Sequence, residues 1–211
     1  MTRVVLVSGY IGMGKDYFFD RITDSTVGDS YSIWSQHFTT IPWLSGGRYN
    51  RCKFANQLKL DVSQQLSITV EELDLLKDRP LQQQHLNYQW KHISPPENPT
   101  YRHILIDIGN YMRSIDPDYW LKMAARDIIP GMVNVITDWR FPNETNIERY
   151  TSSIESVTTV RVHRAGVPIP SINLGSEHLL NDYRPDLLVI SRDDQPADHG
   201  GWMWQYVYKV L

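Results

Sequence analysis

Residues 4–16 read Val-Val-Leu-Val-Ser-Gly-Tyr-Ile-Gly-Met-Gly-Lys-Asp. The run from Val4 to Ser8 is short, apolar and rich in β-branched residues, which is typical of a parallel strand buried on both faces. A glycine-rich loop follows, and residues 16–22 have the pattern of a helix start. This order of strand, loop and helix predicts an α/β fold in which a parallel sheet is flanked by helices and the first strand is central.

The spacing of the loop is G-x-x-x-x-G-K, from Gly9 to Lys15. Between a strand and a helix, this spacing is typical of a phosphate-binding loop, or P-loop. Glycines let successive backbone N–H groups point at phosphate oxygens, the helix start adds partial positive charge, and the lysine supplies a full charge. A plain glycine-rich turn is the alternative. The predicted nucleotide contacts of this stretch are Gly9, Gly12, Met13, Gly14, Lys15, Asp16 and Tyr17.

Two acids are candidates to bind Mg²⁺. Asp16 stands where Ser or Thr normally reaches the metal, and a carboxylate is also a hard oxygen ligand. Alternatively, Asp16 is an acid that complements the helix N-terminus without touching a metal. Asp138 ends the second predicted buried strand, residues 132–138. P-loop enzymes place at this position an acid that holds magnesium or its bound waters. Pro142 suits the first turn of a helix. Glu144 either complements the dipole of that helix or is a site residue.

The rest of the chain alternates predicted strands and helices. Further strands are expected at residues 157–162 and 187–190, and helices at 54–66, 70–76, 104–112 and 117–129. The aromatic stretch 202–208 is expected to form a final helix. We expect one domain over residues 1–211, with a helical region at about 50–130 and a proline-rich lid, or plain surface loop, at about 163–178.

Composition limits the class of protein. The chain has 211 residues and a formal charge of -3, from 21 basic and 24 acidic residues, so it lacks the basic field that drives binding to nucleic acid polymers. Its single cysteine, Cys52, excludes an intramolecular disulfide. No apolar stretch approaches the roughly 20 residues of a membrane span. We therefore expect a cytoplasmic protein without a membrane partner.

The chain resembles the deoxynucleoside monophosphate kinases of bacteriophages, members of the nucleoside monophosphate kinase group. The specific matches are the G-x-x-x-x-G-K-D loop and Asp138-Trp-Arg-Phe-Pro-Asn-Glu144; looser matches are 54–59, 102–113 with Trp120, and Ser176-Glu177 ahead of Asp186. Together they span nearly the full length. The family usually has Thr after the loop aspartate, whereas this chain has Tyr17, so a metal-binding hydroxyl is missing there.

The resemblance implies transfer of the γ-phosphate of ATP, with Mg²⁺, to a deoxynucleoside 5′-monophosphate, in the host cytoplasm if the chain is of phage origin. An acceptor phosphate is already an oxyanion, so catalysis needs positioning and positive charge, and guanidinium groups suit this task. Arg113 and Arg140 are the first candidates for the acceptor phosphate, and Arg161 or Arg164 for the donor phosphates; a solvated surface arginine is the alternative for each. The predicted catalytic residues are Lys15, Arg113, Arg140 and Arg164. The predicted substrate-binding residues are Lys59, Arg79, Arg102, Arg113, Trp120, Asp138, Arg140 and Glu144, and Trp120 has a core residue as its alternative.

Two other functions stay open. A P-loop kinase of an alcohol would need a carboxylate base, for which Asp107 or Asp138 is available. A kinase of another phosphorylated metabolite would need no such base, because its acceptor is already an oxyanion. A nucleotide-binding switch is a third class, although the sequence contains no N-K-x-D motif. The sequence leaves the base preference and the oligomeric state open, a homodimer included.

Overall fold

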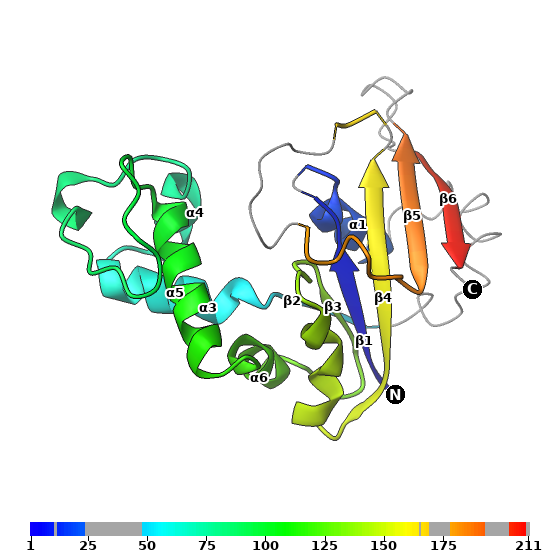
Figure 1. Cartoon of the computed structure of the whole chain (residues 1–211). Helices are drawn as coiled ribbons and strands as arrows, with labels where there is room; N and C mark the ends of the chain where they lie inside the picture. The colour runs from blue at the N-terminus through cyan, green and yellow to red at the C-terminus, as the bar shows by residue number, and fades with distance from the viewer. Residues whose placement is uncertain (11, 24–47, 165, 169–177, 193–202, 210–211) are drawn as a thin grey trace. The chain divides into compact units, whose positions relative to one another are not determined.

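The computed structural model describes residues 1–10, 12–23, 48–164, 166–168, 178–192 and 203–209 (Figure 1). The chain divides into two compact units. The first contains Met1–Lys53 and Asp127–Leu211, and the second contains Phe54–Arg126. The second unit therefore corresponds closely to the helical region expected at about 50–130.

The first unit is built on one six-stranded sheet with the order β2-β3-β1-β4-β5-β6. Its strands are β1 (Thr2–Ser8), β2 (Tyr49–Cys52), β3 (Val133–Ile136), β4 (Ile154–Arg164), β5 (Leu187–Arg192) and β6 (Met203–Lys209). The first five in this order run parallel, and β6 pairs antiparallel with β5. The α/β fold with a parallel sheet and an internal β1 is thus confirmed.

The core of this unit lies between the sheet and α1 (Lys15–Thr23). Val5 and Val7 are fully buried, and Phe18 of α1 packs against them, with Tyr17 partly buried at the edge of the same cluster. Burial of these side chains fixes the first turn of α1 over the end of β1. The loop that joins the two elements is therefore held at both ends.

The second unit is helical. It contains α3 (Ala55–Leu66), α4 (Val70–Leu76), the short 3-10 helix η1 (Gln83–His85), α5 (Tyr101–Ile115) and α6 (Tyr119–Arg126). Helix α4 begins with a capping box, because the Thr69 hydroxyl accepts from the Glu72 N–H at 3.1 Å and the Glu72 carboxylate accepts from the Thr69 N–H at 2.8 Å. Leu73, Tyr101, Ile104 and Trp120 are among the buried core residues.

One element was predicted wrongly, and one strand was not predicted. The C-terminal stretch forms strand β6 and not a helix, since its aromatic and β-branched residues suit a strand that pairs with β5. The four-residue strand β2 was not predicted, because Tyr-Asn-Arg-Cys lacks both an apolar run and a clear alternation. The predicted helix 117–129 is shorter than expected, from Tyr119 to Arg126. Most of the predicted lid, residues 165 and 169–177, lies outside the described residues.

A 3-10 helix, η2 (Pro142–Tyr150), follows β3 and has the proline in its first turn, as the sequence predicted. Among the residues that the structure describes, no helix is long and apolar enough to cross a membrane.

Candidate functional site

The glycine loop lies between β1 and α1, and its backbone needs glycine. Gly14 has a φ of 83°, in the left-handed region that side chains disfavour. Gly9 has a φ of 151°, and a Cβ there would stand 2.6 Å from the carbonyl oxygen of Val162 on β4. Glycine at position 9 thus allows the loop to pass close to the neighbouring strand.

The side chain of Lys15 lies in the curve of this loop. Its ammonium group donates to the carbonyl oxygens of Gly9, at 2.6 Å, and Tyr10, at 3.0 Å. Lys15 is also the first residue of α1, and Gly14 accepts the first helical bond, from the Phe18 N–H at 2.8 Å. The positive end of the helix and the lysine charge are therefore at the same place, which is the arrangement that binds phosphate groups.

The carboxyl ends of the parallel strands meet beside the loop. Leu6 of β1 pairs with Ile136 of β3, so Ser8 and Asp138, each two residues further on, come to the same edge of the sheet. β1 has β3 on one side and β4 on the other, and chain connections from this part of the sheet run in both directions. Such a switch point in an open α/β sheet is where ligands bind, outside the carboxyl ends of the strands.

A pocket opens at this edge, on the side of β1 that faces β4. Its lining includes Gly9 and Tyr10 of the loop, Arg140 after β3, and Arg161 of β4. The sequence analysis placed Arg140 and Arg161 on different substrates, yet the structure brings both to one pocket.

Polar contacts shape the far wall of the pocket. The guanidinium of Arg161 donates to the carbonyl oxygens of Leu180 and Asn181. The hydroxyl of Tyr10 donates to the Asn181 side-chain oxygen at 2.6 Å. Burial lowers the pKa of Arg161, although the group stays charged at neutral pH. Arg164 ends β4, and its backbone N–H lies 3.3 Å from the sulfur of the buried Met13.

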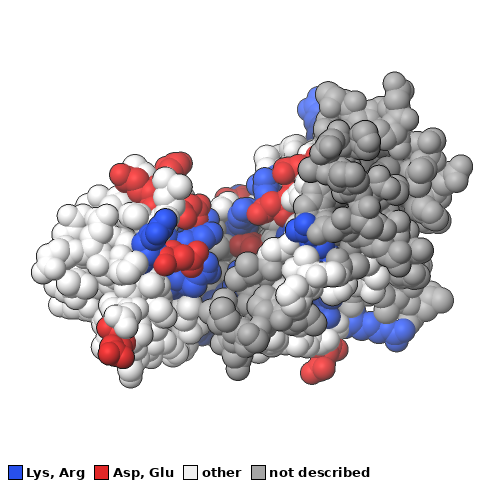
Figure 2. Space-filling model, turned by 90° about the horizontal axis from the view of Figure 1, so that it is seen from above, with Lys and Arg blue, Asp and Glu red and all other residues white. Residues whose placement is uncertain are grey.

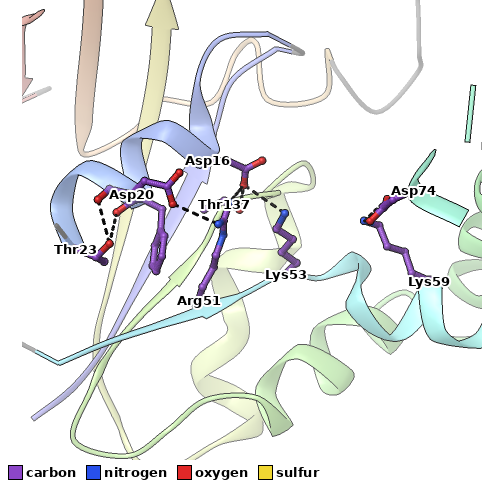
Figure 3. Close-up of polar contacts among 9 residues, drawn as sticks. Asp16, Asp20, Thr23, Arg51, Lys53, Lys59, Asp74 and Thr137 are labelled. Carbon is purple, nitrogen blue, oxygen red and sulfur yellow. Dashed lines mark hydrogen bonds and ion pairs between the residues drawn. The ribbon is translucent and has the colours of Figure 1, made fainter. Parts of the chain in front are cut away.

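Asp16, in the first turn of α1, is surrounded by donors (Figure 3). Its Oδ1 accepts from the Thr137 hydroxyl at 3.0 Å, from the guanidinium of Arg51 and from the ammonium of Lys53 at 3.3 Å. We call Asp16, Arg51, Lys53 and Thr137 the Asp16 cluster. Partial burial alone would raise the pKa of the Asp16 carboxyl, but Arg51, Lys53 and Thr137 together lower it, so Asp16 is ionised at neutral pH.

The electrostatics of the Asp16 cluster bear on magnesium. Two cationic side chains already face Oδ1 of the Asp16 carboxylate, and their positive charge opposes a second cation beside it. Asp16 therefore fits a direct metal ligand poorly. Within the described residues there is no group of three or more His, Cys, Asp or Glu side chains that could hold a metal ion. One or two carboxylates with phosphate oxygens and water suffice for Mg²⁺, so this finding is compatible with a site completed by a nucleotide.

Asp138 fits the role of a metal ligand better. It is half-buried just beyond β3, at the edge where the loop lies. Nearby, the pKa of the Cys52 thiol is raised to about 12 by burial first and then by the charges of Asp127 and Asp138. Glu144 is buried and accepts from the backbone N–H groups of Arg140, at 2.9 Å, and Phe141, at 3.1 Å. Glu144 thus fixes the backbone that carries Arg140, which favours its structural reading.

The side chains of four of the five predicted residues of the second unit contact a residue of that unit. Lys59 pairs with Asp74 at 2.6 Å, and both Nε and Nη2 of Arg102 donate to Asp78, at 2.5 and 3.0 Å. Trp120 is 2% exposed, and its indole N–H donates to the carbonyl oxygen of Gly109 at 3.0 Å, which favours its reading as a core residue. Arg113 Nη1 lies 3.4 Å from the same carbonyl, and Arg79 is exposed.

Asp107, considered as a base for an alcohol acceptor, has a structural role. Its carboxylate is fully buried and accepts four hydrogen bonds, at 2.7–2.8 Å, from Tyr88 and from the backbone N–H groups of Lys91, His92 and Ile93. A carboxylate with these donors is a poor proton acceptor.

Charge of both signs is mixed on the face that Figure 2 shows, where Lys and Arg side chains lie next to Asp and Glu side chains. Anion binding at the loop therefore depends on local placement of cations. Two such cations, Arg51 on β2 and Lys53 directly after it, were not among the predicted site residues, because strand β2 was not predicted. Their spacing of two, which puts side chains on the same side of an extended segment, was the available signal.

No protein-family model matches the chain, and no curated protein matches it.

Proposed function

We propose that the chain is an ATP-dependent kinase of a deoxynucleoside 5′-monophosphate, as its resemblance to the bacteriophage enzymes implies. The observation that carries the proposal is the position of Lys15. Its ammonium group lies inside a glycine loop, at the start of α1 and at the carboxyl edge of the parallel sheet. This combination of lysine, helix start and backbone curvature suits the terminal phosphates of a nucleoside triphosphate.

In the proposed reaction, an oxygen of the acceptor phosphate forms a bond to the γ-phosphorus of ATP. The bond from that phosphorus to the β–γ bridging oxygen breaks, and its electron pair stays on the leaving ADP. The acceptor oxygen already carries negative charge, so the reaction needs no general base. The protein supplies position and positive charge instead.

The residues of the first unit have complementary roles in this reaction. Lys15 neutralises charge on the β- and γ-phosphates, and Arg140 and Arg161 supply guanidinium groups to the pocket beside Gly9. Asp138 would hold Mg²⁺, which when bound shields the phosphate charges. Tyr10 and Asn181 shape the pocket wall through their hydrogen bond.

The surroundings of Asp107 argue against one alternative, a kinase of an alcohol. An alcohol kinase that used Asp107 as base conflicts with the four hydrogen bonds that this carboxylate already accepts. Asp138 is the remaining candidate for that chemistry.

A panel of acceptors tests the proposal. ADP formation from ATP and Mg²⁺ is measured with each deoxynucleoside and ribonucleoside monophosphate, with simple alcohols, and without acceptor. We expect ADP formation that depends on at least one nucleoside monophosphate. Slow hydrolysis that no acceptor changes would support a nucleotide switch and contradict the proposal.

A further inference from the structure

The Asp16 cluster lies beside the loop but outside the pocket that contains Arg140 and Arg161. Arg51 belongs to β2 and Lys53 follows that strand, while the pocket lies towards β4. In the sheet, β2 and β4 are on opposite sides of β1. The loop therefore has cationic side chains on both sides.

Asp16 has the geometry of an anchor for these cations. Its Oδ1 accepts from the hydroxyl of Thr137, which is 2% exposed, at 3.0 Å. The same oxygen meets both Arg51 and Lys53, which are two residues apart and so reach the same carboxylate. Figure 3 shows both side chains directed at Asp16. A single carboxylate thus orders two long side chains that would otherwise sample many rotamers.

Arg51 and Lys53 keep donors that an anion can reach. Arg51 also lies 3.5 Å from Asp20, one turn further along α1. Arg51, Lys53 and the neighbouring Lys15 balance the three acids of this region, Asp16, Asp20 and Asp138, so an anion would be held by the donors of Arg51 and Lys53 and not by an excess of positive charge. The side chains of Arg51 and Lys53 are 33% and 29% exposed, which leaves part of each accessible to a ligand. A phosphate group is a suitable ligand, because arginine and lysine both donate to its oxygens.

We propose that Arg51 and Lys53 bind the phosphate of the acceptor and that Asp16 positions them, an inference that rests on the proposed function. Lys15 then lies between the two substrates, with the acceptor phosphate on the β2 side and the donor on the β4 side. Asp16 acts through its cations and makes no contact with metal or substrate. This role differs from that of the Ser or Thr that the loop normally has at this position.

The test compares Arg51→Met, Lys53→Met and Asp16→Asn with the wild-type chain and with Asp20→Asn as a matched control. Asp20 is on the same helix and contacts the same arginine, but lies a turn away from the loop. Steady-state kinetics give KM for the monophosphate that the wild-type chain uses, KM for ATP, and the dependence on Mg²⁺. Calorimetry with that monophosphate alone, without ATP or metal, gives acceptor binding independently of turnover.

We expect Arg51→Met and Lys53→Met each to raise KM and Kd for the monophosphate about tenfold, since a hydrogen bond to a charged group is lost. KM for ATP should change less than about twofold. Asp16→Asn should raise the monophosphate KM roughly threefold or more, with an unchanged half-saturating Mg²⁺ concentration, and should have a smaller effect in the Arg51→Met background, where only Lys53 is left to position. Asp20→Asn should stay within about twofold of wild type. Arg51→Lys should partly restore the affinity that Arg51→Met loses.

The outcomes separate the two proposals. A wild-type chain that transfers phosphate to no monophosphate would overturn the proposed function and this inference with it. Transfer by the wild type, with the monophosphate KM and Kd unchanged in both Arg51→Met and Lys53→Met, would overturn the inference alone. A shifted Mg²⁺ titration in Asp16→Asn, with an unchanged monophosphate Kd, would instead make Asp16 a metal ligand. Thermal melts of each variant verify that it is folded, and Arg51→Lys serves as the conservative substitute if Arg51→Met is not.

Discussion

Asp16 of the first unit and Asp107 of the second are both ionised carboxylates with lowered pKa values, but their surroundings differ. Asp107 is fully buried, and its donors are three backbone N–H groups and a tyrosine hydroxyl. Asp16 is exposed, and its partners include two partly exposed cationic side chains beside the glycine loop. The first arrangement stabilises a fold, whereas the second places charge where a ligand can reach it.

The same contrast extends to the basic residues of the two units. In the helical unit, Lys59 and Arg102 are each paired with an acid of their own unit. At the loop, Arg51 and Lys53 share one acid, Asp16, and the Lys15 ammonium donates to two backbone carbonyls of the glycine loop. Because the proposed function places phosphate groups at this loop, substitutions near it should change catalysis, and substitutions in the second unit should mainly change stability.

The largest effect is expected for Lys15→Ala. Loss of a positive charge that acts on transition-state charge should lower kcat about 10²–10³-fold. The free energy of unfolding should change little, since the ammonium group is not part of the apolar core. Steady-state kinetics and urea denaturation measure the two quantities, and Lys59→Ala is the control in the second unit. Near-normal turnover in Lys15→Ala would remove the loop from the catalytic site.

Asp107→Ala should have the largest effect on stability. Four donors lose their acceptor in a buried position, so the free energy of unfolding should fall by about 3 kcal/mol or more. Urea denaturation followed by circular dichroism measures this loss, with Asp61→Ala on α3, a half-buried aspartate that accepts from the Gln57 side chain, as control. A loss below about 1 kcal/mol would show that water or a rearranged loop satisfies the donors of residues 91–93.

Arg140→Ala should have an intermediate effect on catalysis. Loss of a guanidinium from the loop pocket should lower kcat/KM roughly tenfold to a hundredfold. A defect confined to the monophosphate KM would place Arg140 on the acceptor, and a defect confined to the ATP KM would place it on the donor with Arg161. Unchanged kinetics with both substrates would exclude Arg140 from the site.

Acid should destabilise the chain partly through Asp107. Burial alone would raise the pKa of this carboxyl, but its hydrogen bonds outweigh burial and lower it below the ordinary value near 4. A lowered folded-state pKa adds stability above the ordinary pKa, and this stability is lost as the pH falls through the folded-state pKa. The free energy of unfolding should therefore fall more steeply in wild type than in Asp107→Asn as the pH is lowered below the ordinary carboxyl pKa near 4. Equal slopes would show that Asp107 does not contribute.

The smallest effect is expected for Arg102→Ala. The guanidinium is engaged with Asp78, and an exposed pair of this kind contributes at most about 1 kcal/mol. The kinetic constants should stay within about twofold of wild type. A tenfold rise in the monophosphate KM would instead return Arg102 to the acceptor-binding residues that the sequence indicated.

The sequence predicted the parts of the fold that have strong local patterns. The apolar run of β1, the glycine spacing and the β3 segment were all found where expected. Strand β2 was missed because half of its residues are polar, and β6 was assigned as a helix because alternation and aromatic content are ambiguous in a short segment. Its pairing with β5 decides the conformation, and such a contact is distant in sequence.

In the candidate site too, residues with a local sequence pattern were predicted, whereas contacts between distant segments were not. Lys15 and the glycines follow from local spacing, and Arg140 and Arg161 were named from composition and resemblance. That these two arginines line one pocket, and that Arg51 and Lys53 meet Asp16, depends on the order of strands in the sheet. Trp120 was ambiguous for a related reason: only its burial and its bond to Gly109 distinguish a core tryptophan from a base-stacking one.

Transfer of a labelled phosphate tests the proposed kinase activity most directly. ATP labelled in its γ-phosphate is incubated with Mg²⁺, the chain and each deoxynucleoside monophosphate in turn, and the products are separated. We expect the label in the β-phosphate of one or more deoxynucleoside diphosphates, and its loss in Lys15→Ala. Label that appears only as inorganic phosphate, at a rate that no monophosphate changes, would contradict the proposed kinase activity.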